Sequence, residues 1–211
     1  MYFALLVLFA GTVIYFSVTS RLKAYIGALS AQGVILFLIV LINMKETNLP
    51  NLIFILLETI GFKTILIPYI LGRIVYQNEA SRDVDVSISS FFSILAMILI
   101  FSFGFLLSFY TKDLLSYSNP FHFGVAFSSI IAGMYIILTK KRLITHIMGY
   151  MVFENGIFLF SLSLLKEMPL IVNLGVLLEL FMIVFISGFF ISRIKESYND
   201  DNIDNLTDLR D

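Results

Sequence analysis

The chain contains no cysteine and only two histidines among its 211 residues. Without thiolates it cannot ligate an iron–sulfur cluster or build a thiolate metal site. The histidines, His122 and His146, are too few and too far apart in the sequence to form a metal cluster. Any redox or hydrolytic centre that works with this protein is therefore expected in another chain. We expect no nucleic-acid partner.

Charge is also scarce, because only 14% of the residues are charged and 59% are hydrophobic, with a mean hydropathy of +0.94. A soluble domain is not this apolar. A membrane span needs about 20 largely apolar residues. Seven such runs occur, and they are unbroken rather than alternating, which favours helices over a barrel. They cover residues 2–19, 22–43, 50–76, 88–110, 123–139, 142–165 and 169–193. The sequence predicts an all-α integral membrane protein with seven transmembrane helices in lipid.

The basic residues predict an orientation. Arg21 and Lys23 follow the first run instead of preceding it, so we expect this run to be retained rather than cleaved as a signal peptide. With the N-terminus outside, basic residues gather in the inner loops. The inner ones are Arg21, Lys23, Arg73, Arg82, Lys140, Lys141, Arg142, Arg193, Lys195 and Arg210, and the outer ones are Lys45, Lys112 and Lys166. This predicts a multi-pass protein of the cell inner membrane with a cytoplasmic C-terminus.

The sequence repeats itself at an offset of about 121 residues. The segment 27–37 aligns with 149–159, placing Gln32 opposite Glu154, and Glu58 aligns with Glu179. Four spans precede the second copy, so both copies face the same way, unlike the inverted repeats of many transporters. The predicted units are a three-helix repeat (1–76), a cytoplasmic loop with a linker helix (77–122), a second three-helix repeat (123–194) and a polar cytoplasmic tail (195–211).

Four ionisable residues lie inside the apolar runs: Glu58, Lys63, Glu154 and Glu179. A charge at the centre of a bilayer costs roughly 2.5–3.5 kcal/mol on insertion scales, so such residues are rarely kept without a use. Glu179 has no basic residue within a turn, and an unpaired buried carboxylate prefers to be neutral. We expect these four residues to take part in proton translocation.

Glu154 is expected at the mid-plane, because it lies twelve residues, about 18 Å of helix, from Arg142. His146 and Tyr150 precede it at spacings of four, which places all three on one helix face. This stripe is typical of a proton entry path from the inner surface. The alternative is a protonated glutamate that hydrogen-bonds a neighbouring helix. Gln32 occupies the Glu154 position in the first copy and cannot carry a proton as an ion.

Lys63 is the central residue of its run. Glu58 lies five residues away, about 140° around an α-helix, which disfavours an ion pair within the helix. Lys63 is expected to face another helix or a partner subunit, either as a proton relay or as an assembly contact. Pro68 removes the hydrogen bond to the Thr64 carbonyl and is expected to kink the helix. His122 is expected at the outer interface, simply solvated.

Three segments resemble hydrogenase-4 component E of formate hydrogenlyase-type complexes, and the resemblance covers essentially the whole chain. They are Ile147–Gly156, Lys63–Pro68 and Asn205–Arg210. The second repeat is similar to the K subunit of complex I and to the C subunit of Mrp-type antiporters, whose last two helices each carry a glutamate. Glu154 and Glu179 match these positions. The family carries a neutral residue at the Glu58 position, so the resemblance assigns that residue no role.

The resemblance implies a membrane-arm subunit that is not itself an enzyme, in a group 4 [NiFe]-hydrogenase or related complex that moves protons or sodium ions. The implied partners are antiporter-like membrane subunits, an anchor like the H subunit of complex I, and a cytoplasmic hydrogenase and iron–sulfur arm. The [NiFe] and iron–sulfur centres are expected in those partners and no cofactor in this chain. The alternatives are a purely structural or assembly subunit, an Mrp-type antiporter subunit, or a stand-alone transporter. The last is disfavoured because no pair of broken helices is predicted.

Overall fold

The computed structural model describes residues 1–43, 57–77, 88–112 and 119–164, with the isolated positions Ile53, Leu177, Phe181, Val184 and Gly188. The predicted span 169–193, Glu179 within it, and the tail 195–211 otherwise lie outside the described residues. The described elements are α1 (Tyr2–Val18), α2 (Leu22–Asn43), η1 (Leu57–Leu66), α4 (Ile67–Gln77), α5 (Ser90–Thr111), α6 (Pro120–Thr139) and α7 (Leu143–Leu164). All of them are helical, which confirms the predicted all-α class for this part of the chain.

Four of the described helices are long and apolar enough to cross a membrane: α2, α5, α6 and α7. The apolar α1 is shorter, with 17 residues. Together they indicate a membrane protein. Large apolar side chains remain exposed along α5, as expected for a surface that faces lipid rather than water.

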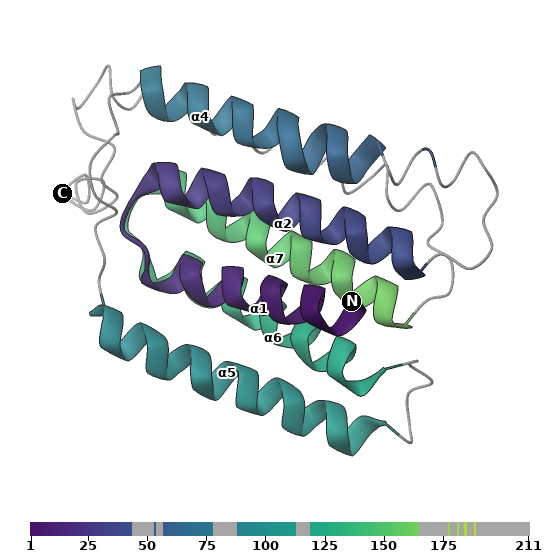
Figure 1. The fold of residues 1–211 in the computed structure, drawn as a ribbon. Coiled ribbons are helices and arrows are strands. Elements are labelled where there is room, and N and C mark those ends of the chain that lie inside the picture. Colours follow the sequence, from purple (N-terminus) through teal and green to yellow (C-terminus); the bar gives the residue numbers. More distant parts are fainter. Residues whose placement is uncertain are drawn as a thin grey trace.

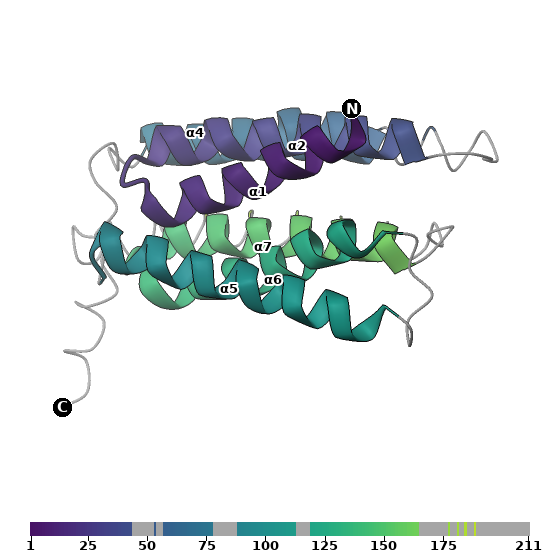
Figure 2. The ribbon, with the colours of Figure 1, turned by 60° about the horizontal axis from the view of Figure 1, so that its bottom comes forward.

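The helices pack in two layers with nearly parallel axes. α1, α2 and α4 form one layer, and α5, α6 and α7 form the other (Figures 1 and 2). Within the layers, α6 packs on α5 and α7, and α2 packs on η1. Between the layers, α1 contacts α5 and α6, and α2 contacts α7. The interior between the layers is where polar side chains of η1 and α7 can meet.

Two helical hairpins, α1–α2 and α6–α7, place their basic turns at the same end of the bundle. Lys140, in the second turn, donates hydrogen bonds from Nζ to the carbonyls of Ser17 (3.3 Å) and Thr19 (3.4 Å), at the end of α1. At the opposite end, the Asn119 side chain accepts from the Phe121 backbone and Pro120 opens α6. This cap starts α6 three residues before the predicted boundary.

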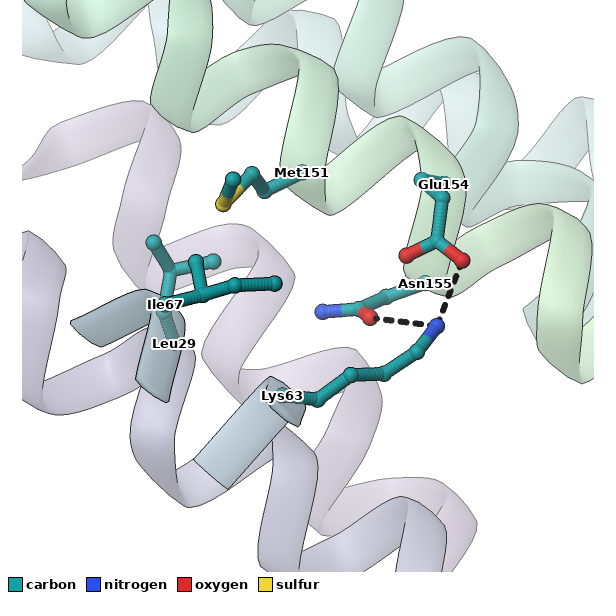
Figure 3. A pocket seen from close by; sticks show the side chains of 6 residues that line it. All are labelled: Leu29, Lys63, Ile67, Met151, Glu154 and Asn155. Atoms are coloured by element: carbon teal, nitrogen blue, oxygen red, sulfur yellow. Dashed lines mark hydrogen bonds and ion pairs between the residues drawn. The ribbon is translucent and has the colours of Figure 1, made fainter. Parts of the chain in front are cut away.

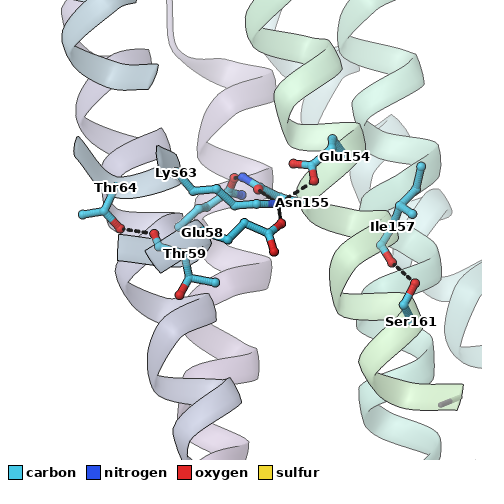
Figure 4. Close-up of polar contacts among 9 residues, drawn as sticks. Glu58, Thr59, Lys63, Thr64, Glu154, Asn155, Ile157 and Ser161 are labelled. Atoms are coloured by element: carbon cyan, nitrogen blue, oxygen red, sulfur yellow. Dashed lines mark hydrogen bonds and ion pairs between the residues drawn. The ribbon is translucent and has the colours of Figure 1, made fainter. Parts of the chain in front are cut away.

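The third predicted span is not one α-helix. Among its described residues, η1 is a π-helix, and α4 continues from it. Pro68 lies at the start of α4, next to the change from a π-helix to an α-helix, and the kink expected there stays a prediction. Because Pro68 has no N–H, the Thr64 carbonyl is left for another donor, and Ser30 of α2 supplies it from Oγ at 2.8 Å. Thr64 in turn donates from Oγ1 to the Thr59 carbonyl (Figure 4).

A glycine allows η1 to lie against α2. A Cβ built on Gly33 would come within 2.5 Å of Thr64 Oγ1 and 3.0 Å of the Lys63 carbonyl carbon. The two backbones therefore approach as closely as small residues permit between membrane helices. This contact fixes the position from which the Lys63 side chain leaves η1.

Candidate functional site

Lys63 and Glu154 form a buried ion pair between η1 and α7. Lys63 Nζ lies 2.5 Å from Glu154 Oε1, and the side chains are each 5% exposed. Figure 4 shows both residues pointing toward each other across the space between the two helices. A charge-assisted hydrogen bond of this kind is among the stronger polar contacts in a protein. The two residues singled out at mid-span are thus brought into direct contact.

Glu58 is the third ionisable group of the site. Its Oε1 lies 3.8 Å from Lys63 Nζ, and its side chain is 1% exposed. The expectation that Glu58 and Lys63 point in different directions is wrong, because it assumed an α-helix. In a π-helix residue i bonds to residue i+5, so positions five apart lie much closer around the axis than they do in an α-helix. The spacing of residues in the sequence does not indicate that this segment is a π-helix.

Lys63 points into the protein. Besides Glu154 and Glu58, its ammonium lies 3.5 Å from Asn155 Oδ1 and 4.5 Å from the centre of the Phe158 ring. Of the two expected directions, the structure shows the one toward another helix. The ring face adds a cation–π contact to the two carboxylates.

A chain of hydrogen bonds extends from the ion pair into α2 and α1. Asn155 donates from Nδ2 to Gln32 Oε1 at 3.0 Å, and Gln32 donates from Nε2 to Thr12 Oγ1 at 3.0 Å. Thr12 then donates to the Phe9 carbonyl. The sequence reasoning missed Asn155 and Thr12. The available signal was an amide next to Glu154 within an apolar run, since a buried amide needs partners.

A small cavity adjoins the ion pair (Figure 3). It measures ≈ 10 Å³ and is lined by Leu29, Lys63, Ile67, Met151, Glu154 and Asn155. That volume is about what one water molecule needs, and polar groups on its wall could bind one. α2 and α7 begin at the basic end of the bundle and α4 runs toward it (Figure 1). Leu29, Ile67 and Met151 therefore place the cavity on the basic side of Lys63.

The remaining predicted residues lie apart from this cluster. His146 Nε2 is 2.6 Å from the Lys140 carbonyl, which ties the ring to the turn before α7. Tyr150 is half-buried, with its ring against Phe153. The entry path through these two residues stays a prediction. Glu179 lies outside the described residues.

His122 is not solvated as expected. It is 1% exposed, and its Nδ1 lies 2.5 Å from the Tyr2 hydroxyl. The expectation is wrong because Asn119 and Pro120 begin α6 earlier, which brings His122 into the first helical turn. There the N-terminal turn of α1 covers it.

The described residues contain no group of three or more His, Cys, Asp or Glu that could hold a metal ion. No family model matches the chain, and no solved structure matches it. The chain is similar to the uncharacterized protein Rv0085 of Mycobacterium tuberculosis, with 25% identity over 191 residues. The similarity covers 90% of this chain and 87% of that protein. The likeness therefore extends over nearly the full length of both proteins without assigning an activity to either.

Proposed function

We propose that this protein is a membrane-arm subunit of a complex I-like group 4 [NiFe]-hydrogenase or formate hydrogenlyase-type complex. In this role its buried acid–base groups carry protons, or sodium ions, across part of the membrane when redox chemistry in a partner drives them. The observation that carries the proposal is Lys63, held between Glu154 and Glu58 within the apolar interior.

Stability alone is a poor reason to keep such a cluster. Replacing a buried ion pair by apolar residues of similar volume is often neutral or stabilising by roughly 1–4 kcal/mol. Two carboxylates and one ammonium also carry a net charge of one negative unit, which a single proton neutralises. A group of side chains that exchanges one proton at mid-membrane is suited to proton transfer. If it served only to pack the helices together, the free-energy cost of burying its charges would bring no benefit.

We further propose seven spans arranged as two parallel three-helix repeats and a linker helix, with the N-terminus outside. Two contacts between positions 123 residues apart support related copies packed together: Asn155 with Gln32, and Lys140 with Ser17. The two basic turns also share one end of the bundle, as the charge count requires for a cytoplasmic face.

The proposed partners are antiporter-like membrane subunits, an anchor like the H subunit of complex I, and a cytoplasmic arm that holds the [NiFe] and iron–sulfur centres. This chain would contribute no cofactor and no catalytic residue. Its place would be the inner membrane. Glu179 is assigned to the same proton route, and His146 and Tyr150 to the entry from the cytoplasmic side.

The second candidate is a structural or assembly subunit of such a membrane arm, or of an Mrp-type antiporter. The observation that favours it is that the Lys63–Glu154 pair joins η1 to α7, as an interhelical staple would. Both candidates predict that the chain purifies with other membrane subunits. Isolation of the tagged chain alone from native membranes would contradict them and favour a stand-alone transporter.

Glu154→Gln separates the two candidates in the purified complex reconstituted into vesicles. We expect normal assembly and electron transfer, with protons moved per electron reduced at least several-fold, because the amide cannot ionise. Glu79→Gln, outside every predicted span, is the matched control and should translocate normally. Unchanged translocation with normal assembly would exclude the proton role of Glu154. A lower yield of complex with an unchanged proton-to-electron ratio would instead support the structural role.

A further inference from the structure

If Glu58, Lys63 and Glu154 were all charged, the cluster would carry one excess negative charge. The three side chains are at most 5% exposed, so bulk water does not offset that charge. An uncompensated buried carboxylate is strongly disfavoured and takes up a proton instead. In the neutral cluster, therefore, one of the two carboxylates is protonated and the other is ionised.

The distances decide which carboxylate carries it. Lys63 Nζ is 2.5 Å from Glu154 but 3.8 Å from Glu58, and the longer separation is too great for a hydrogen bond. Because Coulomb attraction grows as the separation falls, the ammonium stabilises the ionised form of Glu154 more strongly. Glu154 is the ion-paired carboxylate.

Glu58 has fewer contacts than Glu154 that would stabilise a negative charge, because, in the described structure, only the more distant Lys63 ammonium faces it. Within the described part of the chain, its Oε2 is buried and has no hydrogen-bond partner. Among the residues that the structure describes, the charged groups near it are Lys63 on η1 and Glu154 on α7, and the latter repels a second negative charge. From α2, Gln32 is already engaged with Asn155 and Thr12.

We propose that Glu58 holds the exchangeable proton of this site while Lys63 keeps Glu154 ionised. That this proton is used in transport rests on the proposed function. The cavity beside Glu154 lies on the basic side of Lys63, and Glu58 precedes Lys63 by five residues on η1, farther from the basic end. Glu58 gives up its proton when the Lys63 ammonium moves from Glu154 to Glu58, and Glu154 then takes a proton from the cavity side. The cluster stays neutral in both arrangements.

Carbodiimide labelling tests the assignment, because dicyclohexylcarbodiimide reacts with protonated carboxyl groups in apolar surroundings. We expect native membranes treated at neutral pH to give an adduct on Glu58 and none on Glu154, as read by mass spectrometry of the peptides. Lys63→Gln is the matched variant: with the ammonium gone, both carboxylates are protonated and both should be labelled, which shows that the reagent reaches Glu154. Labelling of Glu154 with Glu58 spared in the native protein would overturn the proposal.

Infrared spectroscopy of the purified protein counts the protons without a reagent. Compared with the native protein, Glu58→Gln should lose one carboxylic acid carbonyl band that shifts in deuterium oxide, and Lys63→Gln should gain one. Equal carboxylic absorption in the native protein and Glu58→Gln would overturn the proposal even if labelling fails for lack of access. Both measurements report protonation, not transport. Normal translocation by Glu154→Gln would therefore reject the proposed function and leave the Glu58 assignment to these tests.

Discussion

At the scale of single residues, the interior shows that polar groups between membrane helices are retained as a connected set. The ammonium of Lys63 contacts Asn155, which binds Gln32, which binds Thr12. Each member supplies the partner that the next one needs in a place without bulk water. Loss of one member leaves its neighbour with an unpaired buried group, so the energies of the members depend on one another.

The Gln32–Asn155 contact can be measured by a double-mutant cycle. Gln32→Leu and Asn155→Leu should each lower the free energy of unfolding in detergent micelles, and the double variant should lose less than their sum. Interhelical hydrogen bonds in membranes give coupling energies of about 0.6 kcal/mol on average and up to about 1.7 kcal/mol. A cycle between Gln32 and Ser108 is the control, because Ser108 hydrogen-bonds the Pro120 carbonyl and not Gln32. The two losses in unfolding free energy should then be additive. Additive losses for Gln32 and Asn155 would mean that their contact contributes nothing.

At the scale of elements, hydropathy predicted most of the described helices to within three residues. It could not predict η1, because a π-helix and an α-helix of the same apolar residues differ in winding and not in composition. Pro68 lies close to the point where η1 passes into α4, and counting from the ends of the apolar runs singled out Lys63 and Glu154, which contact each other. Their pairing could not be derived, because it depends on which faces of η1 and α7 meet. That contact is set by side-chain packing over both helices.

Gly33→Ala tests how tightly η1 is held. The added methyl group would meet the backbone of η1 at Thr64 and Lys63, and neither can move without shifting the π-helix. Overpacking of this kind typically costs about 1–3 kcal/mol. We expect a matching loss in unfolding free energy and weaker pairing of Lys63 with Glu154. Gly27→Ala on the same helix is the control, because its Cβ would meet nothing within 4 Å. Equal stability of the two variants would show that the close approach is not needed.

At the scale of the whole molecule, the two hairpins are tied at their basic end by a side chain from one reaching the other. Lys140 is 3% exposed, donates to the last carbonyls of α1 and lies 5.8 Å from the centre of the Tyr25 ring. A cation at a helix C-terminus also interacts favourably with the helix dipole. The sequence could predict that the basic turns share a face, but not that Lys140 is buried between them.

The burial of Lys140 makes the stability of this junction depend on pH. Desolvation lowers the pKa of Lys140 from 10.5 to about 8. Between these values the unfolded chain binds more protons than the folded one, so the free energy of unfolding rises with pH across this window. Below about pH 8 both states are protonated and the cost of the buried charge is fully present. The total rise is at most about 3 kcal/mol.

Thermal unfolding of the purified protein in micelles, followed from pH 7 to pH 10.5, measures this dependence. The native protein should gain stability through the window, and Lys140→Met should show a smaller gain, because methionine has no proton to lose. Lys23→Met, at the same end of the bundle but exposed, should keep the native slope. A native-like slope in Lys140→Met would assign the pH dependence to other groups. It would also mean that the buried ammonium is not the titrating link between the two hairpins.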